Sequence, residues 1–279
     1  MRIFSQSLSK RFFGAAIAAA LFTSGAFAQE KKWKDGEYDM GLLKQWEEKF
    51  PESDFKLERA QANLVVCNQK QDGACVYNAA KKLLTVDPKS FQALYFLTVM
   101  TISSNKTDAE GMETGVKASN GLLGMLDTMF AADKKPQGVD DAGWKKQRVD
   151  TEVLALKTLG WVEQQKKDFP KAEEFFKKAL DVNPANAEMS YFLGTVIVQQ
   201  KKVERQSEAM WHFARAGHLD GPYALDATRK GQVAAYFKRV FTAFAGDDAK
   251  AMQEVVDQAK ANPYPPAGFK IKSKEEKMA

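Results

Sequence analysis

Residues 153–186 read VLALKTLGWVEQQKKDFPKAEEFFKKALDVNPAN, and this stretch decides the fold. Apolar residues recur at helical spacing on both sides of a polar centre, which predicts two amphipathic helices joined by a turn. Gly160 in the first helix and Ala172 in the second are small enough to let the two backbones approach closely. Phe176 fills the groove between them, and Pro184 ends the second helix because proline cannot continue one. The stretch therefore predicts an antiparallel helical hairpin.

A second copy of this pattern follows the first. The Leu-Gly pair at 193–194 repeats the pair at 159–160 after 34 positions, whereas Phe213 repeats Phe176 after 37 positions. The difference of three residues predicts an insertion near the turn of the second hairpin, around residues 201–205. Self-similarity at a fixed period is the sequence signature of a repeat protein.

The spacing resembles that of the tetratricopeptide repeat, a helical hairpin of about 34 residues. With Val153 as position 1, Glu163 stands at position 11, where the family usually has an aromatic residue. The resemblance implies an all-α fold of antiparallel helical hairpins, stacked in a right-handed solenoid and closed by C-terminal capping helices. The signature positions that do match are Leu156, Leu159, Gly160, Ala172, Phe176, Ala179 and Pro184.

The rest of the chain divides according to periodicity, proline and charge. Helical patterns of the same kind, with a less regular signature, occupy the region before the clear repeat, and a polar stretch with proline and glycine separates the two regions. The segments that we expect are a signal peptide (1–28), an N-terminal segment (29–54), degenerate hairpins (55–132), two repeats (142–222), C-terminal capping helices (223–262) and an extended polar tail (263–279).

The first 28 residues have the features of a secretory signal peptide. A basic start is followed by a mostly apolar stretch at 12–22, and Ala26-Phe27-Ala28 is a small-x-small cleavage site. Cleavage near Ala28 would leave Gln29 as the first residue of a periplasmic or secreted protein. No later apolar run approaches the roughly 20 residues that a membrane span needs, so we expect no span in the mature chain.

Net charge argues against a nucleic-acid partner. The whole chain has a formal charge of +5, and residues 1–28 hold three basic residues and no acidic one, which leaves about +2. A charge this small gives no long-range attraction for a polyanion. The hydrophobic share of 44% and the charged share of 28% are those of an ordinary globular protein.

The two cysteines, Cys67 and Cys75, are separated by a segment with a turn signal at Asp72-Gly73. Export would place them in an oxidising compartment. If one helix ends near Cys67 and the next begins near Cys75, a disulfide would close the turn and contribute about 2.5 kcal/mol in the chain-entropy model. The alternative is two buried thiols that never meet. Their spacing matches no zinc or haem motif.

No catalytic chemistry is indicated. The sequence contains no HExxH motif, no glycine-rich phosphate loop and no GxSxG elbow. Its two histidines, His212 and His218, lie six positions apart without a neighbouring cysteine, and no pair of carboxylates stands out from the surface acids. We therefore expect a protein that is not an enzyme and has no catalytic residue, metal site or cofactor.

The resemblance instead implies recognition of a partner. In the family, the first helices of the hairpins line a concave groove, which suits an extended peptide or a helix. The protein would be a scaffold or adaptor that binds a protein or peptide, with a binder of cell-wall glycan or another small ligand as the alternative. A third possibility is that the aromatic residues only pack against neighbouring helices. The residues that the family pattern assigns to the groove are Lys157, Trp161, Gln164, Tyr191, Thr195 and Val198.

Mass spectrometry of the protein purified from the producing cell tests the disulfide and the export signal together. After alkylation without reductant, we expect both cysteines to be unmodified, because the disulfide protects them. We expect the chain to begin at Gln29. Two alkylated thiols would contradict the bridge, and retention of residues 1–28 would contradict the cleavage.

Overall fold

A computed structural model describes residues 40–50 and 55–278, and all regular secondary structure within these ranges is helical. This confirms the predicted all-α class for the described part of the chain. The predicted signal peptide lies outside the described residues. The α-helices are α3 (Met40–Lys49), α4 (Lys56–Gln69), α5 (Gly73–Val86), α6 (Phe91–Ser103), α7 (Ala109–Met129), α8 (Asp141–Gln165), α9 (Phe169–Val182), α10 (Ala187–Gln199), α11 (Gln206–His218), α12 (Ala227–Ala245), α13 (Ala249–Ala261) and α14 (Lys274–Met278), with 3-10 turns η1 (Ala132–Lys134) and η2 (Val203–Arg205).

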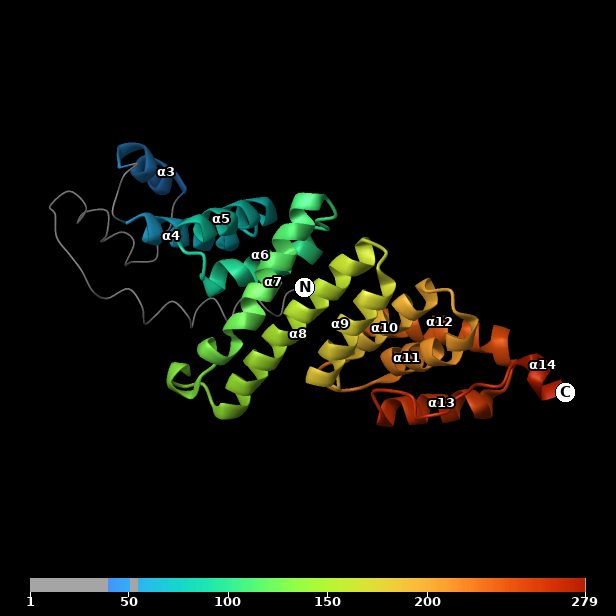
Figure 1. Cartoon of the computed structure of the whole chain (residues 1–279). Helices are drawn as coiled ribbons and strands as arrows, with labels where there is room; N and C mark the ends of the chain where they lie inside the picture. Colours follow the sequence, from blue (N-terminus) through green and yellow to red (C-terminus); the bar gives the residue numbers. More distant parts are fainter. Residues whose placement is uncertain (1–39, 51–54, 279) are drawn as a thin grey trace. The chain divides into compact units, whose positions relative to one another are not determined.

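The described chain forms two compact units. The first comprises the described residues up to Leu97 together with Gly124–Arg148, and the second comprises Thr98–Leu123 and the residues from Val149 onward. In the first unit α4 packs on α5. In the second unit α9 packs on α10, α10 on α11 and α11 on α12, and α13 packs on α11 (Figure 1). From α9 to α12, helices that follow one another in the chain are therefore neighbours in space, whereas α13 returns to pack on α11.

The hairpin of α8 and α9 is built on a contact between a glycine and an aromatic ring. A Cβ atom added at Gly160 would stand 2.6 Å from Cε1 of Phe176, much closer than two carbon atoms normally approach. Ala172 and Phe176 are fully buried. Asp168 begins α9, since its carboxylate accepts a hydrogen bond from the Lys171 amide at 3.2 Å.

The hairpin of α10 and α11 repeats this contact. A Cβ atom at Gly194 would stand 3.0 Å from the ring of Phe213. The extra residues predicted near this turn form η2, which leads directly into α11. The insertion therefore lengthens the connection and leaves the helix contact in place.

Glu163 stands where the repeat pattern would put an aromatic residue, and its side chain is buried. Its carboxylate lies 3.2 Å from the ammonium groups of both Lys166 and Lys171. The two lysines, each about half exposed, reach in from the solvent to neutralise it. A paired charge thus replaces an apolar contact at this point of the hairpin.

Four hairpin turns share one backbone conformation. Gln71, Asn105, Lys167 and Lys201 all have φ between 47° and 64°, in the left-handed region that residues other than glycine rarely adopt. Each donates its amide proton to the carbonyl three residues earlier. Gln71 and Asn105 are 34 positions apart, and so are Lys167 and Lys201. The same turn recurs in the region where the sequence signature is irregular.

Cys67 and Cys75 form a disulfide that ties the end of α4 to the start of α5. Glu163 and Lys171 lie 96 positions further along the chain, and the left-handed residues of the two turns are also 96 apart. The disulfide and the Glu163–Lys171 ion pair therefore occupy equivalent places in two hairpins. Both hold the second helix to the first just beside the turn.

The C-terminal region contains the two expected helices, α12 and α13. Helix α12 begins at Ala227, four residues after the predicted start at 223, because Asp226 caps it by accepting the Arg229 amide proton at 3.0 Å.

The predicted extended polar tail, residues 263–279, is wrong in two respects. First, Phe269 and Ile271 turn inward and join the core around α11, because an apolar face is available to them there. Second, Lys274–Met278 forms α14. Ser273 and Glu276 start this helix with reciprocal hydrogen bonds of 3.2 and 3.0 Å between side chain and amide, the arrangement known as a capping box.

The glycine contact is tested by two Gly→Ala substitutions. In Gly160→Ala the added methyl group collides with Phe176, which destabilises the protein, while alanine favours the helix more than glycine does. We expect the net result to be a fall of about 1–2 kcal/mol in the free energy of unfolding. Gly231 lies in α12, where a methyl group would have no atom within 4 Å, so Gly231→Ala should raise stability by about 0.5–1 kcal/mol. Urea denaturation measures both. Equal effects would contradict the close contact.

Candidate functional site

The predicted groove residues lie on α8 and α10, and these two helices run side by side. Lys157 Nζ lies 3.1 Å from Glu188 Oε2. Further along both helices, Gln164 Nε2 donates a hydrogen bond to Gln199 Oε1 at 2.9 Å. Because both contacts advance in the same direction along the chain, the helices are parallel. This is the relation that the first helices of successive hairpins would have.

Helix α12 continues the same row. Arg229 Nη1 lies 3.2 Å from Glu188 Oε1, so one carboxylate joins side chains from three helices. Burial raises the pKa of Glu188, but the charges and hydrogen bonds of Lys157 and Arg229 outweigh burial and lower it overall. We call this surface the α8–α10–α12 face; it comprises Lys157, Gln164, Glu188, Tyr191, Thr195, Val198, Gln199 and Arg229.

Three of the predicted residues on α10 differ in accessibility. Val198 is 49% exposed and is the one exposed large apolar side chain on α10; elsewhere in this unit, Val203 on η2 and Met278 on α14 are exposed too. Tyr191 is half-buried, with its ring edge-on to Phe213 at a centroid distance of 6.2 Å. The Thr195 hydroxyl donates to the Tyr191 carbonyl at 2.8 Å within the same helix. A partner on this face would therefore meet Val198 and the accessible part of Tyr191.

Trp161 does not offer a surface for binding, because only 8% of it is exposed. Its neighbour Val162 is fully buried, so this part of α8 is interior. Of the possibilities raised by the sequence, packing against neighbouring helices describes Trp161 best. A binding site for glycan that depends on an exposed Trp161 does not fit this burial.

The surface of α9 and α11 is covered by the end of the chain itself. The Tyr264 hydroxyl donates to the Lys177 carbonyl at 3.0 Å and to Asp181 at 2.7 Å. Further on, the ring of Phe269 lies edge-on to Trp211 at a centroid distance of 4.8 Å. We call residues 262–273 the strap. The strap occupies the surface on the α9–α11 side and leaves the α8–α10–α12 face uncovered.

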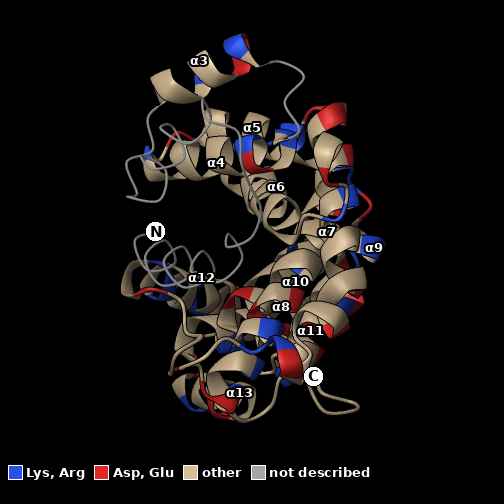
Figure 2. Cartoon of the chain, turned by 90° about the vertical axis from the view of Figure 1, so that its left-hand side faces the viewer, with Lys and Arg blue, Asp and Glu red and all other residues tan. Residues whose placement is uncertain are grey.

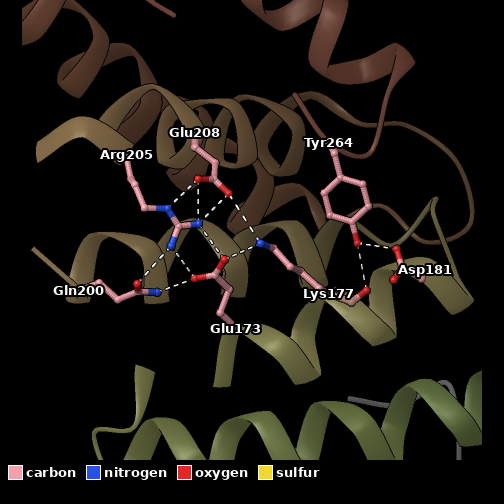
Figure 3. Close-up of polar contacts among 7 residues, drawn as sticks. All are labelled: Glu173, Lys177, Asp181, Gln200, Arg205, Glu208 and Tyr264. Atoms are coloured by element: carbon pink, nitrogen blue, oxygen red, sulfur yellow. Dashed lines mark hydrogen bonds and ion pairs between the residues drawn. The ribbon is translucent and has the colours of Figure 1, made fainter. Parts of the chain in front are cut away.

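An ion network beside the strap joins η2 and α11 to α9 (Figure 3). Arg205 places two guanidinium nitrogens 2.7 Å from the two carboxylate oxygens of Glu173 and also contacts Glu208 at 2.7 Å. Lys177 lies 2.6 Å from Glu173, and Gln200 donates to it. Arg205 belongs to the insertion, so the extra residues supply the cation of the network. The sequence marks the insertion but does not reveal its partner.

The chemistry of this network suits a structural role. Burial raises the pKa of Glu173, but the hydrogen bonds from Arg205, Lys177 and Gln200 prevail and lower it to about 2. The hydrogen bonds that Arg205 donates to Glu173 in turn raise the pKa of Arg205. A carboxylate that is saturated with donors is a poor proton acceptor near neutral pH. The cluster is therefore suited to holding α9 and α11 together rather than to acid–base catalysis.

The two histidines have different surroundings. His212 is fully buried, and neither ring nitrogen has a hydrogen-bond partner in the described structure. His218 Nδ1 lies 2.8 Å from the carbonyl of Ala214 in its own helix.

Positions of Lys and Arg and positions of Asp and Glu are interspersed along the helices in the view of Figure 2. Among the described residues, no three His, Cys, Asp or Glu side chains gather in a way that could hold a metal ion. Within the same ranges, every helix is too short or too polar to cross a bilayer.

Comparison of the chain with known protein families gives no match, and no curated protein matches it in sequence.

Removing Arg205 tests the ion network. In Arg205→Met the carboxylate of Glu173 loses its bidentate partner while it stays buried, and we expect a loss of roughly 3 kcal/mol in the free energy of unfolding. Lys117→Met is the matched control, because Lys117 and Glu113 form an exposed pair on α7. Its effect should stay within about 0.5 kcal/mol. Comparable losses in both variants, measured by urea denaturation, would contradict the role of Arg205.

Proposed function

We propose that this chain is an exported binding protein of the tetratricopeptide type, without enzymatic activity, and that it holds a polypeptide partner on the α8–α10–α12 face. The observation that carries the proposal is the asymmetry of the second unit. Its own strap covers the α9–α11 side, where Trp211 is fully buried, while Val198 on α10 stays 49% exposed. Within the described part of the chain, the strap covers the α9–α11 side, and the half-exposed Val198 lies on the face where the family pattern places a partner.

The recurring turn supports the assignment to this repeat type. Left-handed residues recur at a spacing of 34 positions, and a glycine meets an aromatic ring in two successive hairpins. Both features follow from a repeated hairpin of about 34 residues. The left-handed turn also occurs at Gln71 and Asn105, which supports the proposal that the hairpins before the clear repeat are degenerate copies.

The chemistry of the face favours a polypeptide. Val198 and Tyr191 supply apolar and aromatic contact, and the amide pair Gln164–Gln199 lies beside them on the same two helices. Amide side chains both donate and accept hydrogen bonds, as a peptide backbone does. This combination of aromatic, apolar and amide groups is common at protein interfaces. A nucleic-acid partner would need a strongly positive protein, and the formal net charge of the whole chain is only +5.

The proposed location is the periplasm or the exterior of the cell. It rests on the signal-like sequence of residues 1–28 and agrees with the disulfide between Cys67 and Cys75, since such bonds persist in oxidising compartments. The glycan alternative has no comparable support, because Trp161, its best aromatic platform, is buried.

Site-specific photo-crosslinking tests the face. A photoreactive phenylalanine analogue at position 198 should give a discrete protein adduct in the intact cell envelope, and Tyr191→Ala should weaken this adduct. The matched control is position 203, since Val203 is 71% exposed and lies on η2, outside the face. Adducts of equal yield at both positions would contradict the proposal. Sedimentation of the protein with purified peptidoglycan, without any protein adduct, would favour the glycan alternative.

A further inference from the structure

The strap is held to α11 along its length by few polar contacts. The Ile271 amide donates to Ser207 Oγ at 3.0 Å near the start of α11. Phe269 covers Trp211, and Tyr264 reaches α9 at the other end. The strap therefore runs antiparallel to α11, and it rests on the part of that helix that contains His212.

His212 lies beneath the strap in a site that suits only a neutral ring. The ring is edge-on to Tyr264, with an interplanar angle of 86° and a centroid distance of 6.1 Å. It is 0% exposed, and the described structure offers neither ring nitrogen a hydrogen-bond partner. Protonation would add a charge and a second N–H donor to a site that provides an acceptor for neither.

The charged groups around His212 also oppose protonation. Lys177 and Glu173 act on it from α9, Arg215 from α11 and Arg205 from η2, which makes three cations and one anion. The anion is already bonded to Arg205 and Lys177. Burial, followed by the charges of Lys177 and Arg215, lowers the pKa of His212 to about 3.

The strap itself contributes no charge next to the ring. Burial and the hydrogen bond to Asp181 raise the pKa of Tyr264, so this residue stays neutral across the physiological range.

We propose that the strap is a cover that acid releases: protonation of His212 favours a form in which residues 263–272 have left α11 and solvent reaches the ring. The helices on either side are held more firmly than the strap. Arg205 of η2 joins Glu173 of α9 to Glu208 of α11. Arg215 donates to the carbonyls of Ala259 and Lys260 at the end of α13 at 2.8 and 3.2 Å. Arg215 also donates to the carbonyl of Asn262, at the start of the strap, at 3.3 Å. Residues 263–272 can move without breaking any of these contacts.

The direction of the pH effect follows from the two forms. His212 has a pKa of about 3 beneath the strap and about 6.5 when solvent reaches it. The equilibrium therefore favours the closed form most above about pH 6.5. Below this pH, the equilibrium constant for opening rises about tenfold for each pH unit, until the pH approaches 3. Between pH 7.5 and pH 5.0, the equilibrium constant for opening should rise about 30-fold. Glu173, with a pKa of about 2, stays ionised in this range.

Hydrogen exchange of the Ile271 amide in the full chain measures the opening, because this amide is bonded only across the strap contact. We expect its opening constant, corrected for intrinsic exchange rates, to be about 30-fold larger at pH 5.0 than at pH 7.5. Amides in the middle of α10, such as that of Leu193, should change less. An equal change in α10 would mean global unfolding and would overturn the proposal, as would a pH-independent Ile271 amide.

Two variants separate titration from anchoring. His212→Phe keeps an aromatic ring under the strap but cannot be protonated, so the change between the two pH values should fall below about 3-fold. Tyr264→Phe keeps the ring contact but loses the hydroxyl bonds, so opening should increase at both pH values while the ratio stays near 30. A full pH response in folded His212→Phe would overturn the proposal. If this variant does not fold, the wild-type comparison of Ile271 with α10 still decides.

Discussion

The close approach of paired helices at a glycine is the constraint on which the second unit depends. At Gly160 and again at Gly194, an aromatic ring from the second helix of the hairpin occupies the space that a side chain would take. Each ring is also buried between helices, and Phe176 stacks on Phe192 of α10 with a centroid distance of 4.9 Å. The same ring therefore fixes the spacing within its hairpin and to the next helix. The parallel row of α8 and α10, and the face that this row presents, follow from that spacing.

Much of the fold could be predicted from the sequence because it rests on local periodicity and on small residues at fixed positions. The hairpin of α8 and α9, its copy with an insertion and the two C-terminal helices are all present in the structure. The strap was missed for a physical reason. Phe269 and Ile271 stand among lysines, prolines and glycine, a composition typical of exposed chain, and only α11 supplies the apolar surface that buries them.

For the candidate site, too, the sequence predicts which helices carry the side chains but not how exposed they are or which partners they have. The resemblance to the repeat pattern selects side chains on α8 and α10, and these two helices do run side by side. It does not determine accessibility: Trp161 is buried and Val198 is exposed, although both hold positions assigned to the groove. The partners of Glu173 and Glu188 were also beyond sequence reasoning, because each lies between helices that are distant in the chain. Long-range pairing of charges has no local signature.

The α4–α5 and α8–α9 hairpins are each tied together beside the turn, one by a disulfide and the other by an ion pair. The two hairpins therefore respond to different solution conditions. The disulfide of the α4–α5 hairpin is insensitive to salt but yields to reductants. The Glu163–Lys171 pair of the α8–α9 hairpin ignores reductants, and its partly exposed lysine makes it subject to ionic screening. Reducing conditions would thus loosen the α4–α5 hairpin, and high ionic strength would loosen the α8–α9 hairpin. The same position in two hairpins therefore responds to two different solution conditions.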